Sequence, residues 1–396
     1  MLETLVQLPD DPILGLMAVY RNDPNPLKID LGVGIYKDEA GNTPVLDAVK
    51  KAQLHHINTE TTKAYIGPAG APGFGKVMEA LLLGADHPAI VEGRTNTLQT
   101  PGGCGALRAA AELVKRCNSG ATVWVSNPTW ANHIPLMGDT GLQIKEYPYY
   151  DRETSSIQFE AMIATLEQVG AGDVVLLHGC CHNPCGADLN LQQWEQVAAV
   201  AKARGFLPLV DIAYQGLGDG LDEDAAGLRI LAAAVPELLI TASCSKNFGL
   251  YRERTGAVIA ISASSIARDA THSQLCSVVR ANYSMPPAHG AALVEIILSS
   301  EELTAQWHSE LTLMRNRING LRQLLVDKIV ARGIERDFSF ITREKGMFSF
   351  LGVTPEQVRQ MRSENSIYFV DSSRINIAGI NNSNIDYLVD SLARVL

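Results

Sequence analysis

The sequence predicts an α/β protein built on a mostly parallel sheet. Four apolar runs end on polar residues, as buried strands do where they leave a sheet: TVWVSNPTW (122–130), VVLLHGCCHNP (174–184), FLPLVDIAYQG (206–216) and LLITASCSK (238–246). Helical segments such as 191–204 lie between them, and this alternation is the pattern of βαβ units. Because ligands bind beyond the carboxyl ends of parallel strands, we expect the polar residues after these runs to converge on one site.

A second, smaller unit is indicated in the last third of the chain. An amphipathic helical stretch covers 307–330 and is followed by GMFSFLG (346–352) and YFVDSSRINIAG (368–379). Between these two segments, Thr354 and Gln357 have the spacing of a helix capping box, and Pro355 occupies the favoured first helical position. This mixture of strands and helices predicts a smaller α+β domain.

Composition and charge narrow the classes of function. The chain has 396 residues, of which 46% are hydrophobic and 19% charged, as in ordinary globular proteins. Its formal net charge of −10 argues against nucleic-acid or anionic-membrane partners, because those partners need a basic surface. The opening segment has no basic region before its apolar stretch, and no apolar run approaches the roughly 20 residues of a membrane span. We therefore expect a cytoplasmic protein that binds neither nucleic acid nor membrane.

The seven cysteines are expected to be free thiols, since their number is odd and no secretion signal is apparent. The segment CCHNPC (180–185) could suggest a metal site. It lacks paired C-x-x-C spacing and a second pair of ligands, so we expect no metal there.

A glycine-rich turn joins a strand to a helix in TLQTPGGCGALRAAAELVKR (97–116). The free N–H groups and the positive dipole at the start of that helix suit a phosphate, which would lie against Gly102, Gly103 and Cys104. Plain packing explains the turn equally well, and it has neither the G-x-G-x-x-G nor the G-x-x-x-x-G-K form. Taken alone, it is a weak indication of a phosphate site.

Lys246 follows an apolar strand in ITASCSKNFGLYRERTG (240–256), with Ser243, Ser245 and Arg254 nearby in the sequence. A lysine is ordinarily a solvated surface charge. After a buried run, however, desolvation and a neighbouring cation would lower its pKa toward the neutral amine that attacks an aldehyde. Ser243 and Arg254 could then bind the phosphate of the same cofactor.

Asp211 ends an apolar strand in LVDIAYQG (209–216), and Tyr214 lies three residues further on. One interpretation is an aspartate that caps a following turn. The other is a carboxylate that pairs with a pyridine nitrogen and keeps the ring protonated, so that the ring can act as an electron sink. A strand end beside the lysine-bearing strand end is where that carboxylate is needed.

Several other polar or aromatic residues have ordinary structural explanations. Asn183 precedes Pro184, which is typical of a turn. His178 and His182 are expected to be hydrogen-bonded interior residues rather than catalysts. Trp130 is by default a core aromatic, although at the mouth of the sheet it could stack on a flat cofactor ring.

Seven segments occur in the order found in the class I aspartate aminotransferases: TPGGCGALR, SNPTWANH, HGCCHNPCG, DIAYQG, SKNFGLY, RANYSMPPAHG and SSRINIAGI. The chain resembles this family over its full length, from DPILGL (11–16) to the last helix. The resemblance implies a pyridoxal-phosphate (PLP) enzyme of fold type I. Its large domain, 44–313, would hold a seven-stranded, mostly parallel sheet, and 1–43 with 314–396 would form the small domain. The resemblance also implies a homodimer with active sites shared across the interface.

The resemblance implies a role for each matching residue around the cofactor. Lys246 would carry PLP as a Schiff base and move the proton, Asp211 would pair with the pyridine nitrogen, and Trp130 would stack on the ring. Asn183 and Tyr214 would hydrogen-bond the ring oxygen. The implied phosphate ligands are Gly102, Gly103, Cys104, Ser243, Arg254 and, from the neighbouring subunit, Tyr65.

The implied substrate site depends on two arginines, either of which would by default be a surface charge. Arg374 would bind the α-carboxylate, and Arg280 would bind the distal carboxylate from across the dimer. Each guanidinium can meet a carboxylate with two hydrogen bonds. The other implied substrate contacts are Gly34, Trp130, Asn183 and Phe348.

Three residues depart from the family pattern. Cys104 replaces a hydroxyl residue that donates to the phosphate, and a thiol donates poorly. Ala64 and Met285 replace polar residues that are common in aspartate-selective members, which makes the substrate pocket more apolar.

The resemblance implies transfer of the amino group from L-aspartate to 2-oxoglutarate, which gives oxaloacetate and L-glutamate. The alternative is an aromatic-amino-acid aminotransferase, or an enzyme that accepts both kinds of substrate. A catalytically silent binding protein of the same fold should lack the lysine or its ring partners. All of these are present, which argues against that rival: Lys246, Asp211, Tyr214, Asn183, Arg254 and Arg374.

Overall fold

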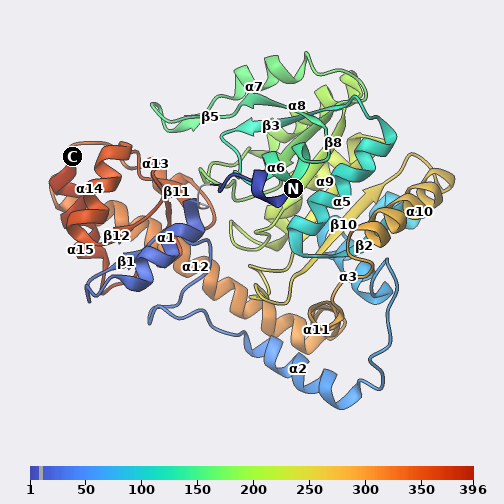
Figure 1. Ribbon diagram of the computed structural model, residues 1–396, viewed down its shortest axis with the longest axis horizontal. Coiled ribbons are helices and arrows are strands. Elements are labelled where there is room, and N and C mark those ends of the chain that lie inside the picture. The colour runs from blue at the N-terminus through green and yellow to red at the C-terminus, as the bar shows by residue number, and fades with distance from the viewer. Residues whose placement is uncertain (9–11) are drawn as a thin grey trace. The chain divides into compact units, whose positions relative to one another are not determined.

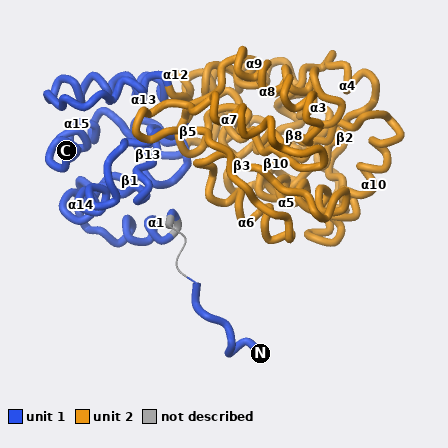
Figure 2. Tube along the Cα trace, turned by 90° about the horizontal axis from the view of Figure 1, so that it is seen from above, with its two compact units in different colours: residues 1–43, 317–343, 347–396 blue, residues 44–316, 344–346 orange. Residues whose placement is uncertain are grey.

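The computed structural model describes residues 1–8 and 12–396, so Asp11 of the DPILGL segment lies outside the described residues. The chain forms two compact units (Figure 2). Unit 1 comprises Met1–Thr43, Arg317–Arg343 and Met347–Leu396, and unit 2 comprises Pro44–Asn316 and Glu344–Gly346. The division into domains of 44–313 and of 1–43 with 314–396 stays a prediction.

Unit 2 contains a seven-stranded sheet in the order β2-β10-β9-β8-β7-β3-β4 (Figure 1). β10 runs antiparallel to both of its neighbours, and the other neighbouring strands are parallel. The prediction of an α/β fold with a mostly parallel sheet is confirmed, because the four apolar runs contain β3, β7, β8 and β9. The strands are β2 (Thr95–Pro101), β3 (Thr122–Asn127), β4 (Gln143–Pro148), β7 (Val174–His178), β8 (Leu207–Ile212), β9 (Leu238–Ser243) and β10 (Thr255–Ile261).

The helices of unit 2 cover this sheet. The helix α8 begins at a capping box of Asn190 and Gln193 and ends at Gly205, whose φ of 73° allows a left-handed cap. A short hairpin pairs β5 (Tyr150–Asp151) with β6 (Ser156–Ile157). The described helices are α2 (Asp47–Thr59), α3 (Pro72–Leu83), α4 (Pro88–Val91), α5 (Gly102–Cys117), α6 (His133–Gly138), α7 (Phe159–Leu166), α8 (Leu191–Arg204), α9 (Leu221–Ala234), α10 (Ser265–Asn282) and α11 (Ala288–Leu298).

A hydrophobic core lies between α5 and the sheet. The alanines of α5, including Ala106 and Ala110, are fully buried and let the helix approach the strands closely. Larger side chains such as Leu98, Val125 and Leu176 fill the space from the sheet side. Each such leucine or valine contributes roughly 1.5–3 kcal/mol when it leaves water. This core anchors the first turn of α5 at the end of β2.

Unit 1 is the smaller α+β unit. The helix α12 (Glu301–Ala331) begins in unit 2 and ends in unit 1. β1 pairs in parallel with β12, and β11 pairs antiparallel with β13. Thr354 and Gln357 form the predicted capping box, with Pro355 at the first helical position. Its other elements are η1 (Leu2–Thr4), α1 (Pro12–Asn22), β1 (Ile29–Asp30), α13 (Phe340–Arg343), β11 (Phe348–Phe350), α14 (Pro355–Asn365), β12 (Ile367–Tyr368), β13 (Arg374–Asn376), η2 (Ile377–Gly379) and α15 (Ile385–Val395).

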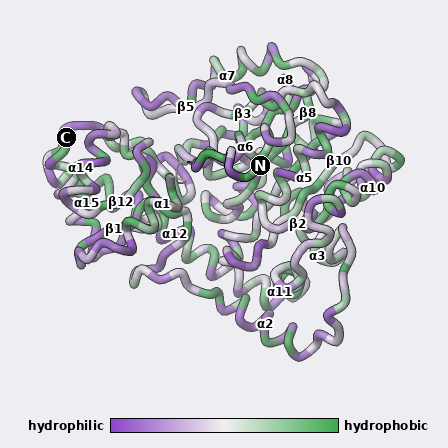
Figure 3. Tube along the Cα trace, in the orientation of Figure 1, coloured by the Kyte–Doolittle hydropathy of each residue, from purple (hydrophilic) through white to green (hydrophobic). Residues whose placement is uncertain are grey.

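Hydropathy follows this architecture. Figure 3 shows that hydrophobic residues are frequent in the strands of the unit 2 sheet, whereas α10 contains hydrophilic stretches. Among residues 1–8 and 12–396, no helix combines the length and the apolar character that crossing a bilayer requires.

Candidate active site

A carboxylate and its hydrogen-bond donors meet at the carboxyl end of β8. Asp211 lies opposite Thr241 of the parallel neighbour β9. Thr241 Oγ1 donates to Asp211 Oδ1 at 2.7 Å, and His133 Nε2 lies 3.2 Å from Asp211 Oδ2. Burial raises the pKa of Asp211, but the hydrogen bonds and charge of His133 and the bond from Thr241 outweigh it and hold the pKa below its usual value. The carboxylate is therefore kept ionised.

His133 is a site residue that the sequence reasoning missed. Its ring is fully buried at the start of α6. His133 Nδ1 lies 2.8 Å from Thr129 Oγ1, which in turn lies 3.1 Å from His178 Nε2. Burial lowers the pKa of His178 to about 3, so its ring is neutral. The neighbouring Trp130 packs edge-on against His133, with ring centroids 5.2 Å apart.

Lys246 lies three residues beyond β9, near these groups. Its Nζ is 4.8 Å from the centroid of the Tyr214 ring. Burial lowers the pKa of Lys246 below its usual value, Asp211 opposes that shift, and Arg254 adds to it. The amine is thus closer to its neutral, nucleophilic form than an exposed lysine would be.

The start of α5 offers a site for an anion. Gly102 has a φ of +71°, and a Cβ placed on it would lie 2.5 Å from Arg254 Nη2. A Cβ on Gly103 would lie 3.3 Å from the side chain of Ser243. The first turn of α5 carries no acidic residue. A helix N-terminus, a guanidinium and a hydroxyl converge here, which fits a phosphate group.

Three more unit 2 residues named from the sequence lie on α5 or in the loops after β7 and β8. Cys104, in the first turn of α5, is half-buried, and Asn132 Nδ2 donates to its Sγ at 3.9 Å. Asn183, in the loop after β7, and Tyr214, in the loop after β8, are both 7% exposed. His178 at the end of β7 pairs with Asp211 in the sheet, so both loops leave the same edge.

Three of the proposed substrate residues meet in unit 1. Arg374 opens β13, is 5% exposed, and donates from Nη2 to the carbonyl of Gly32 at 2.8 Å. Its guanidinium carbon lies 4.3 Å from the centroid of the Phe348 ring. A Cβ on Gly34 would lie only 2.8 Å from Phe348 Cζ, so a glycine is required for this close approach. The three residues form one arginine–aromatic cluster.

Two of the named residues lie at the surface of the single chain. Tyr65 is 90% exposed. Arg280 is exposed in the last turn of α10. In the described part of the chain, its Nη1 donates to Ser284 Oγ rather than to the group around Asp211. Their assignment to a shared site therefore depends on a second subunit.

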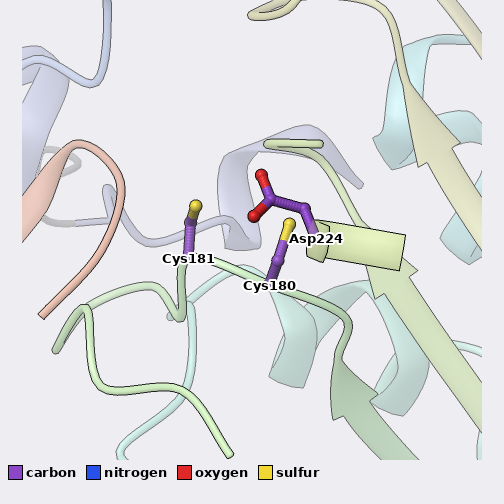
Figure 4. A group of neighbouring side chains, drawn as sticks. All are labelled: Cys180, Cys181 and Asp224. Carbon is purple, nitrogen blue, oxygen red and sulfur yellow. The ribbon is translucent and has the colours of Figure 1, made fainter. Parts of the chain in front are cut away.

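Cys180, Cys181 and Asp224 form a buried cluster next to the Asn183 loop (Figure 4). The carboxylate of Asp224 accepts backbone N–H bonds at 2.8–2.9 Å from residues 216, 218 and 219, which engage both of its oxygens. The hydrogen bond with Cys181 lowers the pKa of Cys180, but burial and the charges of Asp224 and Asp188 together outweigh it and raise the pKa to about 12. Both thiols of the cluster are buried, and backbone donors already engage both oxygens of the carboxylate.

Sequence comparisons identify relatives of the whole chain. Residues 26–392 match the family described as aminotransferase class I and II. The chain is 49% identical over 396 residues to an aspartate aminotransferase of Escherichia coli, and 100% of each chain is covered. It is 47% identical over 395 residues to an aromatic-amino-acid aminotransferase of Paracoccus denitrificans, again with 100% of each covered.

The fold is shared with solved structures of such enzymes. A crystal structure of an aromatic-amino-acid aminotransferase from Burkholderia pseudomallei, covalently bound to pyridoxal phosphate, matches with a TM-score of 0.98 at 43% identity. That match covers 100% of this chain and 99% of the other. The family match, the relatives and the fold agree with a half-buried lysine beside a hydrogen-bonded carboxylate, and the chain belongs to the class I and II aminotransferases, as a PLP-dependent transaminase.

Proposed function

We propose that this transaminase is an aspartate aminotransferase, which transfers the amino group of L-aspartate to 2-oxoglutarate and yields oxaloacetate and L-glutamate. The observation that carries the proposal is the grouping in unit 2 of a lysine with a lowered pKa, an ionised aspartate and an anion site. The name of the Escherichia coli relative supports aspartate as the donor.

The residues of unit 2 fit PLP. The N-terminus of α5, Ser243 and Arg254 would hold its phosphate, and the ionised Asp211 would hold a proton on the ring nitrogen. When bound, PLP supplies an electron sink for the carbanion that forms at the substrate Cα. Lys246 would attach the cofactor as a Schiff base.

The same residues would handle the proton of the reaction. Lys246 would remove the proton from the substrate Cα, because a lowered pKa leaves a larger share of its amine unprotonated and able to accept a proton. Asn183 and Tyr214 would donate to the ring oxygen, and Trp130 would lie on the ring face. The contacts of His133 and Thr241 with Asp211 favour its ionised form.

Substrate binding would use arginines. We propose that Arg374 binds the α-carboxylate, with Phe348 and Gly34 fixing its position, and that Arg280 binds the distal carboxylate. Since Arg280 and Tyr65 lie exposed on the single chain, we propose that the partner subunit of a homodimer supplies both. We also propose that the enzyme acts in the cytoplasm.

A second candidate function is transamination of aromatic amino acids, alone or beside aspartate. Ala64 directly precedes Tyr65, and Met285 directly follows Ser284, the partner of Arg280. Both residues would add apolar surface where an aromatic side chain binds. The Paracoccus denitrificans relative bears the name of such an enzyme.

The test is an absorbance spectrum of the purified protein with PLP, before and after addition of L-aspartate. A protein-bound PLP band that converts to the pyridoxamine form is expected, and 2-oxoglutarate should restore it. Conversion by phenylalanine but not by aspartate would replace the first candidate with the second. A spectrum that neither amino acid changes would refute both.

A further inference from the structure

Arg322 is one of the largest fully buried side chains in the described part of the molecule. It lies in the part of α12 that belongs to unit 1 and is only 1% exposed. Its Nη1 donates to the carbonyl of Ile341 at 3.0 Å and to Ser349 Oγ at 2.9 Å. Its Nη2 donates to the carbonyl of Phe348 at 2.6 Å. One guanidinium therefore holds two consecutive residues of β11.

β11 needs such support because the sheet around it is very small. Within residues 1–8 and 12–396 its one partner is β13, over three residue pairs from Phe348 with Asn376 to Phe350 with Arg374. A two-stranded ribbon of this length has little stability of its own. The donors of Arg322 lie in one rigid plane, so they fix both the position and the tilt of the strand.

The placement of β11 controls the surroundings of Arg374. The Phe348 ring lies 4.3 Å from the Arg374 guanidinium, and Gly34 packs against the ring tip. Asn376, which pairs with Phe348 in the neighbouring strand β13, donates from Nδ2 to the carbonyls of Val33 at 2.6 Å and Ile35 at 2.8 Å. The segment around Gly34, β11 and β13 thus form one hydrogen-bonded assembly, which Arg322 holds from the side of the helix.

We propose that Arg322 is a positioning residue, which acts through Phe348 to aim Arg374 at the substrate α-carboxylate. This inference rests on the proposed role of Arg374 in transamination. Loss of Arg322 removes the donors that it supplies to two backbone carbonyls and one hydroxyl, so β11 shifts and the ring leaves the guanidinium. Binding of every substrate that carries an α-carboxylate then weakens. PLP binding, which uses unit 2, is kept.

The experiment compares substrates with and without that carboxylate. Single turnovers of the PLP-loaded enzyme are followed by absorbance with L-aspartate, L-phenylalanine and 2-phenylethylamine, which is phenylalanine without its carboxylate. In Arg322→Met, both amino acids should lose about tenfold or more in kcat/KM, mainly through a higher KM, because small misplacements of a binding group are costly. The rate with 2-phenylethylamine should change less than about twofold.

A matched control is Arg336→Met. Arg336 also belongs to unit 1 and lies over an aromatic ring, that of Phe338, at 5.5 Å, but it is exposed. The Arg336→Met substitution should leave the rates with all three substrates unchanged. Arg322→Lys keeps the charge without the planar fork and should fall between wild type and Arg322→Met. If Arg322→Met does not fold, Ser349→Ala removes one acceptor of the guanidinium and should show a smaller loss of the same kind.

Two outcomes overturn the proposal while leaving the proposed function intact. One is an equal loss for phenylalanine and 2-phenylethylamine in the Arg322 variants, which would mean general disorder of the site. The other is wild-type rates for the amino acids in both Arg322→Met and Arg322→Lys. A wild-type enzyme that reacts with neither amino acid would instead refute the transamination assignment on which the proposal rests.

Discussion

The two units hold their proposed site residues by different means. In unit 2, Asp211 lies at the end of β8, Lys246 follows the parallel neighbour β9, and the anion site lies at the start of a helix, so backbone topology brings these groups together. In unit 1, Arg374 and Phe348 lie on strands of three residues each and depend on a buried arginine. The proposed cofactor site thus rests on the large sheet, whereas the proposed carboxylate site rests on side-chain packing.

The largest effect is expected for Lys246→Ala, which tests the proposed cofactor site in unit 2. We expect this variant to lose multiple turnover while PLP still binds. The phosphate and ring contacts remain when the amine is gone. Turnover is measured with aspartate and 2-oxoglutarate, and bound PLP is measured by absorbance after dialysis. Lys202→Ala, which changes an exposed lysine of α8, is the control. Turnover near the wild-type rate in Lys246→Ala would end the assignment of this lysine.

The next largest effect concerns Arg280, the arginine proposed to bind the distal carboxylate. Arg280→Leu should cut kcat/KM for aspartate by about 3 kcal/mol in transition-state terms, since a desolvated carboxylate would lose its charged partner. Phenylalanine should lose far less. Both rates are measured as single turnovers without 2-oxoglutarate, because that substrate itself needs Arg280.

The control for Arg280 lies on the same helix. Arg268→Leu removes a surface ion pair with Asp269 and should change neither rate. Equal losses for aspartate and phenylalanine in Arg280→Leu would mean that Arg280 supports the dimer or the cofactor instead of the side chain of the substrate.

Two glycine substitutions compare the units directly. Gly102→Ala places a methyl group against Arg254 at a φ of +71°, which should weaken PLP binding by about 1–3 kcal/mol. Gly34→Ala pushes on the Phe348 ring and should raise KM for amino acids by a similar free energy, with PLP affinity unchanged. PLP titration and steady-state kinetics measure the two effects. Gly320→Ala, where a Cβ meets nothing within 4 Å, should alter neither. A loss of PLP affinity in Gly34→Ala would contradict the proposal that unit 2 binds PLP and unit 1 binds the substrate carboxylate.

The smallest expected effect concerns Cys104. Cys104→Thr should tighten PLP by about 1 kcal/mol, because a hydroxyl donates to a phosphate oxygen better than a thiol does. Equilibrium dialysis of the apoenzyme gives the affinity. Cys117→Thr, at the other end of the same helix, should leave it unchanged. Unchanged affinity in Cys104→Thr would indicate that backbone N–H groups already satisfy that oxygen.

Much of the unit 2 fold could be predicted because strand ends carry a local signal. The run 238–246 is apolar until its last residues, and the structure ends β9 at Ser243. The antiparallel direction of β10 was not predicted, because TGAVIAI is apolar throughout and its pattern is the same in either direction. Direction depends on which neighbours the chain reaches, and a single strand does not carry that information.

The sequence did not predict the side chains that hydrogen-bond the site residues. Thr241 supports Asp211 because β8 and β9 pair in a particular register, which no single segment specifies. His133 reaches the same carboxylate from another helix. In the sequence, Arg322 resembles a surface arginine on an amphipathic helix. In the structure it is buried, and it donates to the carbonyls of Ile341 and of Phe348 in β11. Contacts between segments that are distant in the sequence determine the surroundings of such residues. Their spacing along the chain therefore does not predict these roles.

The cysteines of the described chain are free, and their depths differ. Cys117 is exposed, Cys104 and Cys276 are half-buried, and the other four are buried. A thiol reagent applied to the native protein should therefore label in stages, and the buried set should react only as the large sheet opens. If Cys104 borders the phosphate, loading the protein with PLP should remove one reactive thiol from the count. Labelling kinetics would then report cofactor occupancy and unfolding of the core from the same sample.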